Sequence, residues 1–81
     1  MQPYPDISAS ILAFANERGP DKTTCPSEIA RALFPNHWRE HMKEVVDVAI
    51  SLQNLGKVVI TQKGSAIDIT RIKGPIRIKI R

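Results

Sequence analysis

The chain contains little cysteine and few aromatic residues. Its single cysteine, Cys25, excludes an intramolecular disulfide and leaves no cysteine pair to bind a metal ion. We therefore expect a reducing, cytoplasmic compartment. Of the four aromatic residues, Phe14, Phe34 and Trp38 fall on predicted apolar helix faces. Only Tyr4 remains for stacking on bases, so single-strand binding by base stacking is not expected.

Long apolar runs and phosphate-binding loops are also lacking. No uninterrupted apolar run approaches the roughly 18 residues of a membrane span, and the N-terminal MQPYPDIS has no basic and apolar leader. Gly64 and Gly74 do not form a glycine-rich loop before a helix, so no nucleotide-binding motif is present. We expect one soluble, unprocessed domain over residues 1–81, because a chain of this length builds one small core.

Positive charge is concentrated in the last third of the chain. Residues 1–56 carry five basic and seven acidic side chains, whereas residues 57–81 carry seven basic side chains against Asp68 alone. The net charge is +4, so the C-terminal segment supplies all of the excess. A basic segment of this kind indicates an anionic partner.

Two helices are predicted in the first half of the chain. Asp6 is a plausible N-cap for a helix over residues 6–18, which Gly19 and Pro20 end. A second helix over 26–34 begins with proline and has glutamate three residues after Cys25, as in a capping box. The intervening Lys22-Thr23-Thr24 predicts a short extended link that could form one strand pair.

The third helix is predicted over residues 37–55, with Gly56 as its C-terminal stop. On a helical wheel a buried stripe lies within about 40° of Trp38 and is flanked by Val46 and Leu55; it consists of Met42, Val45, Ala49 and Leu52. The opposite arc is acidic, with Glu40, Glu44 and Asp47 against Lys43 alone. The expected core consists of Ile11, Leu12, Phe14, Ile29, Leu33, Trp38, Met42, Val45, Ala49, Leu52 and the strand isoleucines.

From residue 57 the apolar period changes to two, which predicts strands over 57–62 and 67–80 with a turn at residues 62–65. Ile67 and Ile69 have odd parity, whereas Ile76 and Ile78 have even parity. A regular strand cannot change parity, so we predict a bulge or turn at residues 73–75. The final isoleucines then lie on one face, with basic residues on the other.

This order of elements resembles the winged-helix superfamily, since PSEIARALF and the long helix ending in LQNLGKVVIT are similar to its helix-turn-helix and wing. KTTCPSEIARAL, the Trp38 to Met42 helix start, ITQKG and GPIRI resemble a family of small uncharacterised bacterial domains, over residues 8–80. The resemblance implies an α+β winged helix-turn-helix fold, with three helices followed by a C-terminal β-hairpin wing. It also implies a tendency to bind nucleic acid, although many members of the superfamily are protein-interaction modules.

The segment HWREH matches the H-x-x-E-H pattern of inverted zinc proteases, in which two histidines hold the metal and the glutamate activates water. A catalytic zinc site needs a third protein ligand, and no second motif supplies one. We therefore expect no metal, no cofactor and no enzyme activity. His37 and His41 are interpreted as residues at the boundary between helix and solvent, and Cys25 as a small, mostly buried residue at a capping position.

The lead hypothesis is a non-catalytic nucleic-acid-binding module, with DNA favoured over RNA, that uses its basic wing for backbone contacts. The acidic arc of the third helix argues against sequence-specific readout. The alternatives are that the strand cations only protect a sheet edge, or that the domain binds an acidic protein or a second copy of itself. The candidate contacts are Lys63, Arg71, Lys73, Arg77, Lys79, Arg39 and Lys43.

Overall fold

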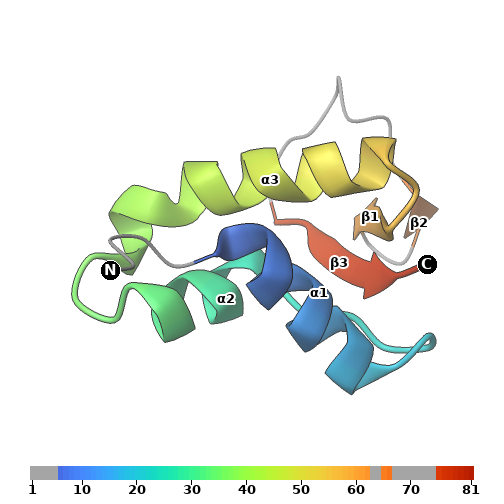
Figure 1. The fold of residues 1–81 in the computed structure, drawn as a ribbon, viewed down its shortest axis with the longest axis horizontal. Helices are drawn as coiled ribbons and strands as arrows, with labels where there is room; N and C mark the ends of the chain where they lie inside the picture. The colour runs from blue at the N-terminus through green and yellow to red at the C-terminus, as the bar shows by residue number, and fades with distance from the viewer. Residues whose placement is uncertain (1–5, 63–64, 67–74) are drawn as a thin grey trace.

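The computed structural model describes residues 6–62, 65–66 and 75–81, and it has the α+β fold predicted from the sequence (Figure 1). Three helices precede an antiparallel sheet, an arrangement consistent with a winged helix. The elements are α1 (Ile7–Arg18), α2 (Pro26–Leu33), the 3-10 helix η1 (Trp38–His41), α3 (Met42–Asn54), β1 (Val58–Gln62), β2 (Ser65–Ala66) and β3 (Arg77–Ile80). None of the described helices is long and apolar enough to cross a membrane.

The first two helices begin and end at or next to the residues that the sequence predicts. The Asp6 carboxylate accepts a hydrogen bond from the Ala9 N–H at 3.0 Å, which satisfies a free donor in the first turn of α1. Gly19 follows α1 with a φ of 82°, a conformation that favours glycine. Helix α2 begins at Pro26 and ends at Leu33, two residues before Pro35. Both helices therefore lie within one residue of their predicted bounds.

The third helix differs from its prediction at the start. Instead of one helix from residue 37, the chain forms η1 and then α3 from Met42. A 3-10 turn holds three residues per turn rather than 3.6, so Trp38 rotates away from the stripe that a continuous α-helix would give it. Trp38 is consequently half-buried against the core, and the prediction that it is a core residue is only partly correct.

The end of α3 is a Schellman motif. The Lys57 N–H donates to the Leu52 carbonyl at 2.9 Å, and the Gly56 N–H donates to the Gln53 carbonyl at 2.9 Å. Gly56 adopts a φ of 77°, which other residues rarely accept. The predicted stop at Gly56 is therefore confirmed, together with its physical reason.

Among the described residues the sheet has three strands, in the order β2-β1-β3, where two strands were predicted. Strand β1 pairs antiparallel with β3, with Ile60 opposite Ile78, and its end pairs with β2. The pairing of Gln62 with Ser65 confirms the predicted chain reversal. Of the strand predicted over 67–80, residues 67–74 lie outside the described residues, and so does most of the predicted bulge.

The link between α1 and α2 also joins the sheet. Thr24 and Ile78 exchange two backbone hydrogen bonds, of 2.8 and 2.7 Å, on the side of β3 away from β1. The strand pair predicted for residues 22–24 is thus formed by a single residue. Ile76 and Ile78 are buried while Arg77 between them is exposed, so the predicted alternation is confirmed in this part of β3.

The core lies where the three helices meet the sheet. In Figure 1, α3 crosses the upper part of the molecule, α1 and α2 lie below it, and the sheet lies toward the C-terminal end of α3. Ala15 and Ala30 are buried although they were not predicted as core, because small side chains allow close helix packing. Buried hydrophobic residues are Ile11, Ala15, Ile29, Ala30, Val45, Ala49, Leu52, Val58, Ile60, Ile76 and Ile78. The predicted core residues Leu12, Phe14, Leu33, Trp38 and Met42 are partly buried around this cluster.

Candidate functional site

The candidate contacts divide into two described groups. Arg77 and Lys79 lie on β3, whereas Arg39 and Lys43 lie on η1 and α3. The other three predicted contacts, Lys63, Arg71 and Lys73, lie outside the described residues. The geometry of the site is therefore given by β3 and by the junction of α2 with α3.

Arg77 is anchored to the link before α2. Its Nε donates to the Thr23 hydroxyl at 2.8 Å, and its Nη2 lies 3.5 Å from the Thr23 carbonyl oxygen. Arg18 donates to the same carbonyl at 3.3 Å, but its charge is compensated by an ion pair with Glu28. No described carboxylate forms an ion pair with Arg77. The Arg77 side chain is thus oriented by neutral partners, with no carboxylate pair among residues 6–62, 65–66 and 75–81.

The outer edge of β3 tests the alternative that the strand cations only prevent pairing of that edge with another strand. At Ile78 that edge is already paired with Thr24, so charge is not needed there to prevent pairing with another strand. Arg77 and Lys79 project on the opposite face of β3 from Ile78, because successive strand residues alternate. At Ile78 the edge is thus protected by the backbone pair with Thr24, while Arg77 and Lys79 lie on the other face of β3.

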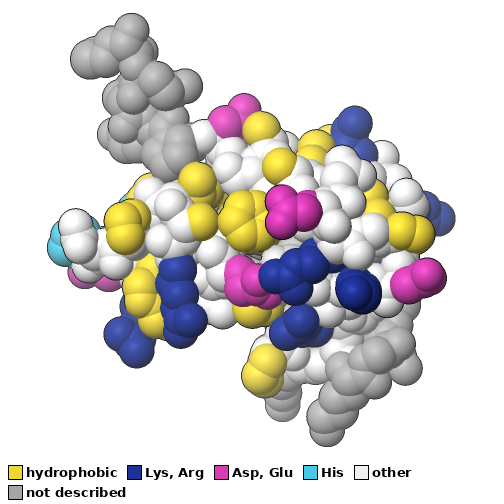
Figure 2. Space-filling model, turned by 90° about the horizontal axis from the view of Figure 1, so that it is seen from below, with side chains coloured by type: hydrophobic (Ala, Val, Ile, Leu, Met, Phe, Trp, Pro, Cys, Tyr) yellow, Lys and Arg dark blue, Asp and Glu magenta, His cyan; other side chains and the backbone are white. Residues whose placement is uncertain are grey.

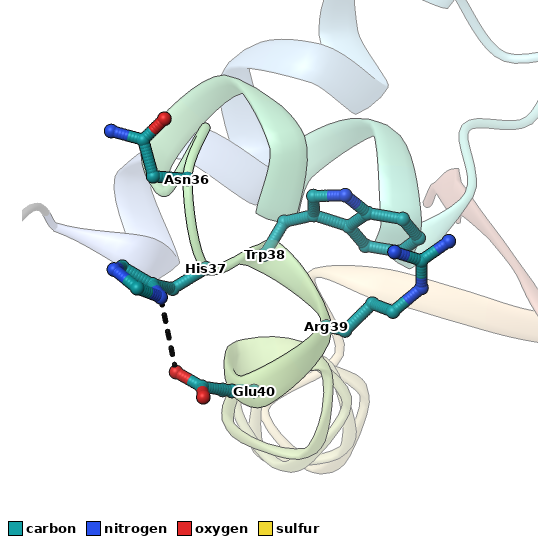
Figure 3. A pocket seen from close by; sticks show the side chains of 5 residues that line it. All are labelled: Asn36, His37, Trp38, Arg39 and Glu40. Carbon is teal, nitrogen blue, oxygen red and sulfur yellow. Dashed lines mark ion pairs between the residues drawn. The ribbon is translucent and has the colours of Figure 1, made fainter.

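The cations near the start of α3 differ from one another. The Lys43 ammonium pairs with Asp47 at 2.9 Å, so its charge is locally compensated. The Arg39 guanidinium instead lies 4.5 Å from the Trp38 ring centroid (Figure 3), and that of Arg31 lies 4.4 Å from it. Sequence reasoning missed Arg31, because it belongs to α2 and only the tertiary fold brings it to the ring.

Each acidic residue of the arc lies close to a basic residue three or four positions away in the chain. The His37 and His41 imidazoles lie 3.4 and 2.5 Å from Glu40 and Glu44 respectively, each three residues further along the chain. With the Lys43 pair, all three acidic residues of the arc have a basic neighbour. The Lys43 ammonium offsets the charge of Asp47, so the repulsion that we expected between this arc and DNA is reduced at that residue.

These pairs also bear on the zinc-protease pattern. The side chain of His37 is 70% exposed, whereas His41 stacks on Phe34 with ring centroids 3.7 Å apart. Each histidine pairs with a different glutamate, rather than sharing one site. In the described part of the chain, no group of three or more histidine, cysteine or acidic residues could hold a metal ion.

Glu28 ties the start of α2 to α1. Its carboxylate accepts the Cys25 N–H at 3.2 Å and the Thr24 hydroxyl at 3.4 Å, and it pairs with Arg18. Burial alone would raise the pKa of Glu28, but the hydrogen bonds from Cys25 and the charge of Arg18 outweigh it and lower the pKa. The predicted capping interaction of Glu28 is therefore present, and Arg18 extends it.

Cys25 is half-buried, slightly more open than predicted. Its thiol lies 3.1 Å from the Ser27 hydroxyl and 3.4 Å from the Glu28 carboxylate. A cavity of about 180 Å³ beside it is lined mainly by apolar side chains. The lining residues are Cys25, Pro26, Ser27, Met42, Val46, Pro75 and Ile76.

The chain matches one protein family over nearly its whole length. Residues 5–81 match the model of the family described as "Protein of unknown function (DUF3253)". The chain belongs to this family. No curated protein matches the chain. The expected membership of an uncharacterised family is thus confirmed. Since the family has no described activity, the function has to be inferred from the chemistry of the side chains.

Lys and Arg side chains gather on part of the described surface of this DUF3253 member. Figure 2 shows Lys and Arg side chains toward the end of the molecule where α2 meets η1 and also nearer the middle, where Asp and Glu side chains lie beside them. Guanidinium groups without carboxylate partners can donate charge-assisted hydrogen bonds to phosphate oxygens.

Proposed function

We propose that this domain is a non-catalytic, cytoplasmic winged-helix module that binds nucleic acid, duplex DNA in preference to RNA, through backbone phosphates. The observation that carries the proposal is the state of Arg77 on β3. This guanidinium is held in place by Thr23 while no described carboxylate neutralises it. An arginine that is positioned but uncompensated is ready to bind an anion.

Contacts of this kind position a protein on DNA without reading its sequence. In a winged helix, the third helix approaches the major groove and the strands of the wing approach the backbone. The side chains on the outer arc of α3 are mostly engaged in local pairs, which leaves few donors for base edges. In the proposed binding mode, the residues of β3 therefore make the main contacts, and there is little sequence preference.

The proposal is tested by removing the charges of β3. Fluorescence anisotropy with a random-sequence duplex would compare the wild type with the double variant Arg77→Gln/Lys79→Gln at 0.1 M salt. Between 1 M and 0.1 M salt, one phosphate contact strengthens binding roughly eightfold, so its loss should weaken binding at 0.1 M by that factor. Two lost contacts should therefore weaken it roughly 60-fold. Melting temperatures of both proteins would check that the variant is folded.

A matched control removes two charges at other sites. Lys22 and Lys57 are exposed, and no described carboxylate forms an ion pair with them. The double variant Lys22→Gln/Lys57→Gln should lose less than about threefold in affinity, because it changes net charge without removing a β3 contact. Equal losses in the two double variants would mean that net charge alone determines binding, and they would contradict the proposed role of β3.

A protein-interaction module is the second candidate. The apolar cavity beside Cys25 favours it, together with Leu55, which is 69% exposed at the end of α3. Recovery of one protein from a lysate after nuclease treatment would support this function. Recovery that requires intact nucleic acid would support the first.

A further inference from the structure

Two arginines from different elements share one aromatic ring. The guanidinium carbon of Arg31, on α2, lies 4.4 Å from the Trp38 ring centroid, and that of Arg39, on η1, lies 4.5 Å from it. The two guanidinium carbons are therefore at most 8.9 Å apart. Phosphate oxygens accept hydrogen bonds of about 2.7–2.9 Å, so one phosphate at the edge of the ring could accept from both guanidinium groups.

The ring orients these arginines without neutralising them. Both side chains are exposed, and neither forms an ion pair with a carboxylate in residues 6–62, 65–66 and 75–81. The negative face of an indole attracts a guanidinium, yet it carries no net charge. Two like charges held on one ring repel each other, and a bound anion would relieve that repulsion.

The surroundings of the ring leave space for such an anion. A hollow of about 180 Å³ adjoins Trp38 and Arg39, and Asn36, His37 and Glu40 complete its lining (Figure 3). Glu40 on this lining is unfavourable for an anion, but its carboxylate lies 3.4 Å from the His37 imidazole. The hollow is thus lined by Arg39 and one acid, Glu40, while Arg31 contacts the same ring from outside the hollow.

We propose that Arg31, Trp38 and Arg39 form a clamp that holds one backbone phosphate of duplex DNA. The inference rests on the proposed function and adds to it a site at the junction of α2 and α3. In helix-turn-helix proteins the first helix crosses the DNA backbone and the second enters the groove from its N-terminal end. Arg31 on α2 and Arg39 just before α3 occupy the corresponding places in this fold.

Because the clamp and the cations of β3 lie on different elements, a ligand with several phosphates is favoured over an isolated carboxylate. The cations of β3 belong to a separate element, so a ligand that uses both groups must carry charges at repeated, widely spaced points. A duplex carries a charge on every nucleotide of both strands and meets this requirement. An acidic protein segment is the competing ligand, and it enters the test as a competitor.

A double-mutant cycle tests the clamp. Duplex affinity would be measured at 0.1 M salt for the wild type, Arg31→Gln, Arg39→Gln and the double variant, with Lys22→Gln/Lys57→Gln as the control for charge. If both arginines hold one phosphate, each single variant should lose roughly fivefold and the double variant only roughly eightfold, which is one contact. The salt slope of the double variant should fall by about 0.9, the value of one phosphate.

Trp38 provides an independent readout, because it is the only tryptophan in the chain. Duplex DNA should change the fluorescence of Trp38 in the wild type, and the double arginine variant should lose this change. The variant Trp38→Phe, which keeps an aromatic face, should bind duplex more tightly than Trp38→Leu. Melting curves of both variants would identify any loss of affinity that comes from unfolding.

The outcomes separate the clamp from the proposed function. Wild-type protein that does not bind duplex would contradict both. Binding that is unaffected in the arginine variants would overturn the clamp alone. So would a loss of roughly 60-fold in the double variant, since it would indicate two independent phosphates. Displacement of DNA by polyglutamate at equal charge concentration would assign the site to acidic proteins instead.

Discussion

Replacement of Glu28 by alanine should destabilise the domain by about 2–4 kcal/mol. The hydrogen bonds that its carboxylate accepts from Cys25 and Thr24 contribute about 1.5–3 kcal/mol, as expected for a charged acceptor. The side chains of the Arg18 pair are 37% and 32% exposed, so that pair adds only about 0.2–1 kcal/mol. Because a domain of 81 residues has a stability of about 4–12 kcal/mol, the variant should remain folded at 25 °C.

Thermal and urea unfolding, followed by circular dichroism, would measure this loss. The melting temperature should fall by about 4–8 °C for each kcal/mol. The control Glu28→Gln retains hydrogen-bond acceptors but not the charge, so it should lose about 1 kcal/mol or less. Equal stability of wild type and the alanine variant would refute the assignment of Glu28 as the link between α1 and α2.

The same residue predicts a pH dependence with a defined sign. The pKa of Glu28 is lowered in the folded protein from its ordinary value of 4.5. Its contribution is therefore complete above pH 4.5 and is lost as the pH falls through the folded pKa. The difference in unfolding free energy between wild type and Glu28→Gln should shrink on acidification below pH 4.5. A difference that grows on acidification would contradict the lowered pKa.

Three further substitutions test separate parts of the account. Gly56→Ala should lower the unfolding free energy by about 1–2 kcal/mol in urea titrations, because Gly56 has a φ of +77° and no neighbour within 4 Å of an added Cβ. Ile78→Ala should lower the unfolding free energy by about 2–5 kcal/mol, since Ile78 is fully buried. Almost no change would contradict the burial of Ile78. Glu40→Gln should raise duplex affinity in anisotropy titrations by up to about fivefold, which corresponds to the 0.2–1 kcal/mol of an exposed charge interaction, and weaker binding would contradict the position of the clamp.

The sequence predicts the elements whose signals are local. Asp6, Pro26 and Gly56 each act within one turn of their own helix, so their effects follow from residue type and spacing. The buried and exposed positions around Ile78 follow from strand alternation in the same way. The α+β fold class is therefore accessible from pattern alone.

Features that depend on packing could not be predicted. The 3-10 turn at Trp38 follows from the way the chain leaves α2, and helical periodicity contains no signal for it. Arg31 reaches Trp38 across two elements, and Thr24 reaches Ile78 across most of the chain. The candidate site was thus only partly foreseen: Arg39 and Arg77 were expected as contacts, but the ring and the threonine that orient them were not.

A salt titration of wild-type binding to duplex DNA tests the central claim most directly. Anisotropy would be followed between 50 and 200 mM salt on two duplexes of unrelated sequence. Each phosphate contact weakens binding roughly 3.5-fold over this interval, so Arg77, Lys79 and the clamp together predict a loss of roughly 40-fold on both duplexes. Absence of binding at 50 mM salt, or an affinity that does not change with salt, would contradict recognition of the DNA backbone by this domain.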